Sequence, residues 1–192
     1  MSAPSSTGKE ILQCARHLIV KGGYNGFSYS DIAKIVGIRN ASIHHHFHTK
    51  AELVRALLVG YRKDVESGLA GLERQSSGPL ELLRAYVAIW AACITDGTAP
   101  VCICALLASE IPVLPEEVVF EVRAHFRYLS AWLTSVLERA AAQGSVRLQG
   151  TARQEAELFM ATIHGAMMSA RAYGDTRAFG DVAQVAVARL AA

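Results

Sequence analysis

The amino-acid sequence predicts an all-α protein, and three observations indicate this class. Apolar residues recur with the 3.6-residue period of an amphipathic helix along the chain, and no segment shows the strict alternation that is typical of a strand. Glycines and prolines lie between the periodic segments, where helices end. Hydrophobic residues make up 52% of the 192 positions and charged residues 19%, which excludes a disordered chain.

The first predicted helix begins near Thr7, which has the spacing of a capping box with Glu10. Apolar residues then form a stripe along one face of the helix, on residues 11–19. Gly22-Gly23 ends the helix, because glycine readily adopts the left-handed conformation that closes a helix.

Two short helices follow, joined by a glycine turn. Ser28 and Asp31 repeat the capping-box spacing, and Gly37 ends the first of the two helices soon afterwards. A second short helix is predicted over residues 39–46. The segment from Ser28 to Phe47 therefore has the form of a helix-turn-helix.

A longer helix begins near Thr49, which has the spacing of a capping box with Glu52, and it runs to about Arg74. The Ser-Ser-Gly-Pro segment at 76–79 interrupts it and is the candidate boundary between domains. Beyond this break the same periodicity, punctuated by glycines and prolines, predicts further helices at about 80–96, 101–111, 116–143, 152–173 and 176–191.

One face of the second short helix packs inside the motif and the other is left free. The packing joins apolar residues of both helices, Ile32, Ala33 and Val36 with Ile38, Ile43 and Phe47. The free face carries Arg39, Asn40, Ser42, His44 and His45, with His46 open to either side. Each of these side chains can donate a hydrogen bond to a phosphate or a base edge, and none is acidic. Arg39 and Asn40 stand at the end of the helix that enters the major groove, so the pattern predicts binding to double-stranded DNA.

Positive charge is concentrated in the N-terminal third of the chain. Residues 1–60 hold seven lysines and arginines against three acidic residues, whereas residues 61–192 hold twelve against fourteen. A local excess of this kind favours contact with a polyanion, although an ordinary solvated surface produces it as well.

Residues 9–58 resemble the DNA-binding segment of the TetR family of bacterial repressors. The pattern that carries the resemblance consists of Ala15-Arg16, Gly22-Gly23-Tyr24, Gly26-Phe27-Ser28-Tyr29-Ser30-Asp31-Ile32-Ala33, Gly37-Ile38, Ser42-Ile43 and His45-His46-Phe47-His48-Thr49-Lys50-Ala51-Glu52-Leu53. The resemblance implies an N-terminal three-helix DNA-binding domain over residues 1–50, with its helix-turn-helix at about 28–47. It also implies a C-terminal helical bundle over residues 51–192 for ligand binding and dimerisation.

The resemblance further implies which residues meet DNA. Phosphate contacts are implied for Tyr29, Ser30 and Lys50, and contacts with bases or backbone for Asn40, Ser42 and His45. His44 departs from the family, which most often has Tyr at this position. An imidazole can still bond a phosphate, but its reach is shorter and its charge depends on pH.

The C-terminal part of the chain contains enough apolar residues for a ligand cavity or a subunit interface besides a core. The candidate ligand-binding residues are Trp90, Cys93, Leu106, Glu110, Phe120, Phe126, Trp132, Met160, His164 and Met167. The same residues would also serve as the core of a five-helix domain. Because the family takes its effectors in this part, the resemblance implies a repressor that an unknown small, largely apolar effector releases from a palindromic operator.

A homodimer is expected, because the family pairs subunits through its last two long helices. In this chain these are 116–143 or 152–173, together with 176–191. Small residues on the middle segment would let two helices approach closely, or would serve packing within one chain: Ala161, Gly165, Ala166, Ser169 and Ala170.

Cysteines and histidines give two other interpretations. Cys102 and Cys104 lie near the start of a short apolar helix, whose dipole would lower a thiol pKa. The alternative function is therefore a helical-bundle sensor of electrophiles or oxidants, and as core residues the same cysteines would be inert. His44 and His48 are spaced like two metal ligands, but the segment offers no evident set of further ligands. We expect no metal and no cofactor.

The remaining patterns exclude other classes. There is no Gly-rich phosphate loop, nucleophile elbow or pair of carboxylates in a polar setting, so we do not expect an enzyme. The longest stretches without a charged residue, 97–109 and 158–170, have 13 residues each and are too short to span a bilayer. No secretory signal is expected at the N-terminus. We expect a cytoplasmic protein with no membrane partner and with reduced cysteines.

Overall fold

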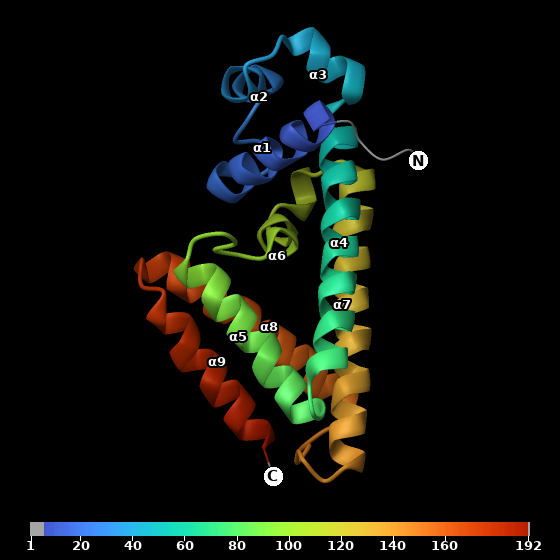
Figure 1. The fold of residues 1–192 in the computed structure, drawn as a ribbon, viewed down its shortest axis with the longest axis vertical. Coiled ribbons are helices and arrows are strands. Elements are labelled where there is room, and N and C mark those ends of the chain that lie inside the picture. Colours follow the sequence, from blue (N-terminus) through green and yellow to red (C-terminus); the bar gives the residue numbers. More distant parts are fainter. Residues whose placement is uncertain (1–5, 192) are drawn as a thin grey trace. The chain divides into compact units, whose positions relative to one another are not determined.

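The computed structural model describes residues 6–191, and its helices are shown in Figure 1. Within these residues the chain forms nine α-helices, one short 3-10 helix and no strand, apart from an isolated antiparallel bridge between Val146 and Ala191. The predicted all-α class is therefore confirmed.

The helices are, in chain order, α1 (Ser6–Gly22), α2 (Tyr29–Val36), α3 (Asn40–His46), α4 (Lys50–Gln75), α5 (Pro79–Thr95), α6 (Ile103–Ala108), the 3-10 helix η1 (Ile111–Val113), α7 (Glu116–Ala142), α8 (Ala152–Tyr173) and α9 (Arg177–Leu190). Most of the predicted helices agree with these bounds to within one or two residues.

Two details of the sequence prediction were wrong. Thr7 lies inside α1 and so is not the residue that precedes its first turn. The single helix predicted at 101–111 is instead α6 followed by the separate turn η1. Pro112 has no N–H group, so the α-helical hydrogen bonds cannot continue through it.

The chain folds into two compact units. The first contains the described residues up to Asp64 and the segment Ile103–His125. The second contains Val65–Cys102 and the described residues from Phe126 onward. Helices α4 and α7 each contribute residues to both units. The expected division of function at residue 50 concerns which residues bind DNA and which bind a ligand, and it stays a prediction.

In the first unit, α1 packs against α2, α3 and α6. The side chains at the centre of this packing are apolar and fully buried: Ile11, Ile19, Ile32, Ile43 and Leu53. Helices α2 and α3 have only 8 and 7 residues, which is too short for a helix to be stable alone in water. Burial of their apolar faces against α1 therefore holds them in place.

In the second unit, α8 and α9 pack along each other, and α5 also packs on α9. The buried stripe of α9 has helical spacing and consists of Phe179, Ala183, Val187 and Leu190. The carboxylate of Glu73 joins α4 to α7, because its Oε1 accepts hydrogen bonds from Trp132 Nε1 at 3.2 Å and Arg139 Nη2 at 2.8 Å.

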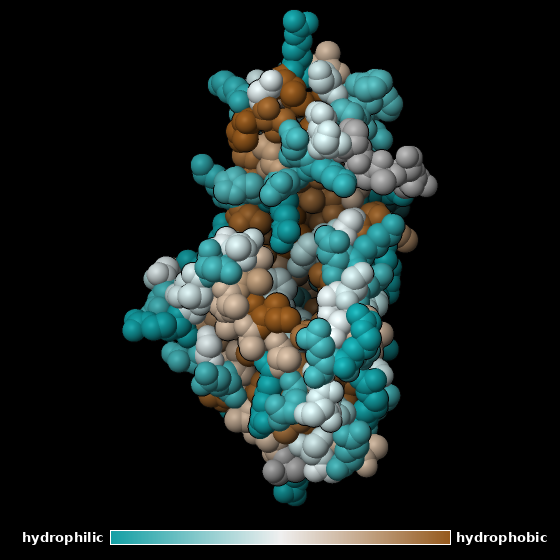
Figure 2. All heavy atoms as spheres, viewed as in Figure 1, coloured by the Kyte–Doolittle hydropathy of each residue, from teal (hydrophilic) through white to brown (hydrophobic). Residues whose placement is uncertain are grey.

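The surface of the second unit includes exposed apolar side chains. Figure 2 shows apolar side chains among polar ones over α5, and Ile89 of this helix is 48% exposed. Other large apolar side chains are exposed on α8 and α9: Leu158, Met168, Tyr173, Val182 and Val185. No helix within residues 6–191 is long and apolar enough to cross a membrane.

Candidate nucleic-acid interface

Both ends of α2 are fixed by local hydrogen bonds. Ser28 has an extended backbone, its Oγ accepts from Asp31 N, and Asp31 Oδ2 accepts from Ser28 N at 2.8 Å. These bonds with Ser28 hold the pKa of the Asp31 carboxyl below its usual range. At the other end Gly37 has φ +77° and its N–H donates to Ala33 O at 2.9 Å. The left-handed backbone favours glycine there, so the predicted capping box and glycine turn are confirmed.

Helix α3 has one buried and one exposed face. Ile43 is fully buried, and Phe47, which directly follows the helix, is 7% exposed. On the other face Arg39, Asn40, His44 and His45 are exposed, while Ser42 and His46 are half-buried. No residue of α3 is acidic. This face therefore presents hydrogen-bond donors without a carboxylate to repel the phosphates of DNA.

The ring of His44 is oriented by two neighbours. It lies edge-on to the ring of Tyr29, with 4.8 Å between the centroids, and its Nδ1 is 3.3 Å from the carbonyl oxygen of His48. A carbonyl oxygen can only accept, so this hydrogen bond requires a proton on Nδ1. In the neutral ring Nε2 then carries a lone pair, and it can donate to a phosphate only after the ring gains a second proton.

Tyr29 is held by the segment that follows α3. Its hydroxyl donates to the carbonyl oxygen of Phe47 at 2.9 Å. Burial, with the charge of Glu52, raises the pKa of Tyr29 to about 12, so the hydroxyl keeps its proton at neutral pH. Because that proton is already used, Tyr29 ties α2 to the end of α3. Its implied contact with phosphate stays a prediction, as does that of the neighbouring Ser30, which is exposed.

Lys50, the first residue of α4, is half-buried between aromatic rings. Its Nζ lies 4.9 Å from the centroid of the Tyr24 ring and 4.1 Å from that of Phe27, and it donates to the carbonyl oxygen of Phe27. Burial lowers the pKa of the Lys50 ammonium, although the charges of Asp31 and Glu110 act in the opposite direction. An ammonium group has three donors, so two remain for a phosphate.

Thr49 caps the start of α4, with one difference from the predicted pattern. Its Oγ1 accepts from Glu52 N at 3.0 Å, as a capping box requires. The carboxylate of Glu52, however, accepts from His48 N at 2.9 Å, one residue earlier than the standard partner. Glu52, in the first turn of α4, thereby fixes the loop between α3 and α4.

The ten candidate ligand-binding residues do not all belong to one compact unit. Leu106, Glu110 and Phe120 belong to the first unit, and the other seven belong to the second. Glu110 Oε2 accepts a hydrogen bond from Tyr24 N at 3.0 Å, and Phe120 is 60% exposed. The Glu110 carboxylate is therefore bonded to the protein backbone in this structure. The assignment of all ten residues to one ligand site stays a prediction.

In the second unit, α7 and α8 bring three of the candidates together. The rings of Phe126 and His164 meet edge to face with 5.3 Å between their centroids. Within residues 6–191, His164 Nε2 is buried without a hydrogen-bond partner. Phe126 and Met160 also line a groove of about 570 Å³. The remaining candidates lie elsewhere: Trp132 donates to Glu73, Met167 is fully buried, and Trp90 and Cys93 are half-buried on α5.

Cys102 and Cys104, the residues of the alternative sensor hypothesis, are 1% and 0% exposed. A sensor thiol must be reachable by its reagent, so the structure gives this hypothesis no support. No cysteine within the described part of the chain forms a disulfide. In the same residues no group of three or more His, Cys, Asp or Glu side chains is arranged to hold a metal ion.

Two family descriptions match the two parts of the chain. "Bacterial regulatory proteins, tetR family" matches residues 11–57, and "Tetracyclin repressor-like, C-terminal domain" matches residues 79–186. The chain belongs to the TetR family. Members of this family bind DNA and function as dimers with small-molecule ligands, so the chain is a DNA-binding transcriptional regulator.

Solved structures and a named relative agree with this assignment. A TetR-family regulator from Agrobacterium tumefaciens is 61% identical, with 99% of this chain and 100% of that chain covered and a TM-score of 0.96. A TetR regulator from Legionella pneumophila is 26% identical, with the same coverage and a TM-score of 0.85. The HTH-type transcriptional repressor KstR2 of Mycolicibacterium smegmatis is 29% identical over 150 residues, which are 76% of this chain and 70% of that protein.

Proposed function

We propose that this TetR-family regulator is a repressor that binds a palindromic operator as a homodimer and is released by a small, largely apolar effector. The observation that supports operator binding is the face of α3, where Arg39, Asn40, His44 and His45 are exposed together on a helix without an acidic residue. Arg39 and Asn40 stand at the N-terminal end of this helix, the end that approaches base edges in the major groove. Lys50 and Ser30 supply phosphate contacts beside it.

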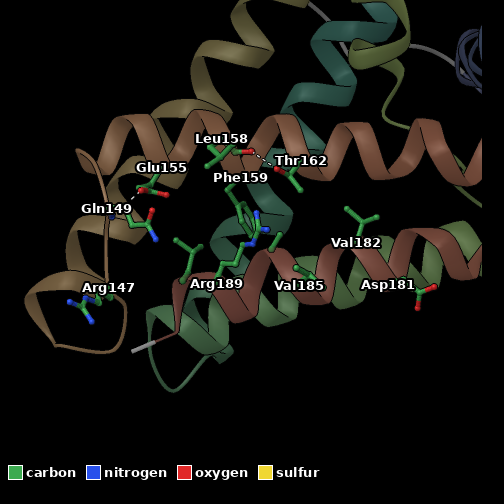
Figure 3. Close-up of a pocket in the computed structure, with 12 residues that line it drawn as sticks. Arg147, Gln149, Glu155, Leu158, Phe159, Thr162, Asp181, Val182, Val185 and Arg189 are labelled. Carbon is green, nitrogen blue, oxygen red and sulfur yellow. Dashed lines mark hydrogen bonds between the residues drawn. The ribbon is translucent and has the colours of Figure 1, made fainter.

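The second copy of the chain docks on α8 and α9. Figure 3 shows the groove between these helices, which has a volume of about 710 Å³. Leu158 from α8 and Val182 and Val185 from α9 line it, with exposures of 61%, 40% and 53%. Exposed apolar side chains gathered on two adjacent helices are typical of a surface that another subunit covers.

Some of the small residues of α8 pack within the chain, and others are free to meet a second copy. Ala166 and Ala170 are buried, so they serve packing within the chain. Ala161 and Gly165 are exposed, and they leave room for a helix of the second copy. Helix α7, the other candidate for the interface, exposes only Phe120 among its large apolar side chains. These observations favour α8 with α9.

We propose an effector site at His164, Phe126 and Met160. A buried polar atom without a partner costs free energy that a ligand can recover by hydrogen bonding. His164 Nε2 therefore suits a molecule with an apolar body and one hydroxyl, carbonyl or carboxylate group. Helix α4 begins at Lys50 and continues into the second unit. Movement of this helix is the proposed route from effector to DNA.

Two substitutions test the DNA-binding assignment. Lys50→Ala should weaken binding to every DNA sequence and lower the salt slope by about one ion, because it removes one phosphate contact. Asn40→Ala should change the preferred sequence at a cost of ~1–3 kcal/mol for the normal site. Selection of bound sequences from a random DNA pool, followed by salt titration, measures both effects.

Lys63→Ala is the charge-matched control for Lys50→Ala. Lys63 is exposed on the same helix, 13 residues further along, which is about 20 Å from Lys50. Its removal should leave the salt slope unchanged. If Asn40→Ala lowered affinity equally for all sequences, the assignment of Asn40 to base recognition would be wrong.

The dimer surface predicts the effect of a charge on α9. Light scattering of the parent protein should give about twice 20.7 kDa. Val185→Glu should give monomers at micromolar concentration, because it places a charged carboxylate among the apolar side chains of the interface. Val113→Glu is the control, since Val113 is 61% exposed on η1, and it should stay dimeric. Dimers of unchanged stability for Val185→Glu would exclude this surface.

The effector site predicts a separable effect of His164→Phe. This variant keeps an aromatic ring and removes the unpartnered nitrogen, so the ligand-free protein should unfold at an unchanged or higher temperature. A thermal-shift screen of small apolar alcohols, ketones and carboxylic acids should find compounds that stabilise the parent and reduce its DNA affinity. The same compounds should stabilise His164→Phe much less. Equal stabilisation of both proteins would show that the effector site does not include His164.

A further inference from the structure

The carboxylate of Glu110 lies against the turn that follows α1. Glu110 comes just after α6, and its Oε2 accepts a hydrogen bond from Tyr24 N at 3.0 Å. The two residues are 86 positions apart in the chain, and both belong to the first compact unit. Helix α6 packs on α1 in the same unit. Glu110 therefore joins the segment after α6 to the segment that leads into the helix-turn-helix.

Gly23 lets the carboxylate come this close. A Cβ atom at Gly23 would overlap Oε1 and Oε2 of Glu110, so both oxygens lie against the Gly23–Tyr24 peptide. Gly23 also has φ +76°, a left-handed conformation that other residues rarely adopt. The turn is thus shaped to receive a side chain from elsewhere in the chain, and not only to end α1.

The same turn holds Lys50. The Tyr24 ring lies under the Lys50 ammonium, and the ammonium donates to the carbonyl oxygen of Phe27, three residues after Tyr24. The negative charge of Glu110 also reaches Lys50, since it favours the charged form of that side chain. A chain of contacts therefore runs from Glu110 through the Tyr24–Phe27 turn to the first residue of α4.

We infer that Glu110 is a positioning residue for DNA binding: by bonding Tyr24 N it holds the Tyr24–Phe27 turn, and the turn holds the Lys50 ammonium where it meets a phosphate. The inference rests on the proposed contact between Lys50 and DNA. It gives Glu110 a role in the DNA-binding unit in place of a role in ligand binding.

The sign of the effect separates positioning from simple electrostatics. DNA is a polyanion, so loss of a nearby negative charge should by itself strengthen binding. Loss of the positioning contact should instead weaken binding. Two conservative variants separate the hydrogen bond from the charge. Glu110→Gln removes the charge and keeps an acceptor oxygen at the same reach, and Glu110→Asp keeps the charge but is one methylene too short to reach Tyr24 N.

The experiment measures binding of the full chain to a random-sequence duplex of about 30 base pairs, because phosphate contacts do not depend on sequence. Fluorescence anisotropy over a range of salt concentrations gives both the affinity and the salt slope. We expect Glu110→Asp and Glu110→Ala to lose about tenfold in affinity and about one ion in slope. Glu110→Gln should stay close to the parent protein. Thermal melting of each variant checks that it is folded.

Glu117→Ala is the control for charge alone. Glu117 is exposed on α7, and its charge also reaches Tyr24, but the Tyr24 N–H donates to Glu110 and not to Glu117. This variant should bind equally well or slightly better. If Glu110→Asp kept the parent's affinity and slope while Glu110→Gln changed them, Glu110 would act through its charge and the inference would be overturned.

A double-mutant cycle with Lys50→Gln completes the test. Glutamine can still donate to the Phe27 carbonyl but carries no charge, so this variant should lose about one ion in salt slope. In the Lys50→Gln background Glu110→Asp should have little further effect, because the two changes remove the same phosphate contact. Independent, additive effects would overturn the inference. If Lys50→Gln left the salt slope unchanged, the proposed contact of Lys50 with DNA would itself be wrong.

Discussion

The proposed DNA-binding face depends on α3, a helix of 7 residues that is fixed by the burial of Ile43 and of Phe47 just after it. A helix this short has too few internal hydrogen bonds to be stable alone, so its position depends on these side chains and on Ile32 of α2. Once Ile43 points into the core, the helical period decides which residues point outward. The exposure of Arg39, Asn40, His44 and His45 thus follows from the burial of two apolar side chains.

Side chain to backbone hydrogen bonds then fix the segments around α3. The hydroxyl of Tyr29 donates to Phe47 O, the carboxylate of Glu52 accepts from His48 N, and the ammonium of Lys50 donates to Phe27 O. Each bond satisfies a backbone group in a loop, where no helix partner is available. Tyr29, Glu52 and Lys50 therefore use part of their hydrogen-bonding capacity on the protein itself. Arg39, Asn40 and His45 take part in none of these loop bonds, so the proposed sequence recognition and the placement of the unit depend largely on different side chains.

The parts of this architecture that could be predicted from sequence are those whose causes lie within a few residues. The capping box of Ser28 and Asp31 and the left-handed cap at Gly37 are local, and their positions were predicted correctly. The helix predicted at 101–111 stops before Pro112 as expected, but its earlier end at Ala108 comes with 3-10 hydrogen bonds at Ser109 and Glu110, which apolar periodicity does not indicate. The bond between Glu110 and Tyr24 joins residues 86 positions apart, and no local pattern indicates it. Apolar periodicity likewise shows that a helix face is buried without showing against which helix, which is why the candidate ligand residues divide between two units.

Two features of the second unit call for different partners. The apolar face of α8 and α9 is exposed over several side chains, and only a surface of similar extent, such as another protein subunit, removes that much apolar area from water. His164 presents the opposite situation, because it is 8% exposed and lacks one hydrogen bond. The ring of Phe126 lies against His164, and a small molecule with a single polar atom suits such a buried nitrogen better than a broad protein surface does. The proposed dimer surface and the proposed effector site therefore differ in their physical requirements, and occupation of one leaves the requirement of the other unmet.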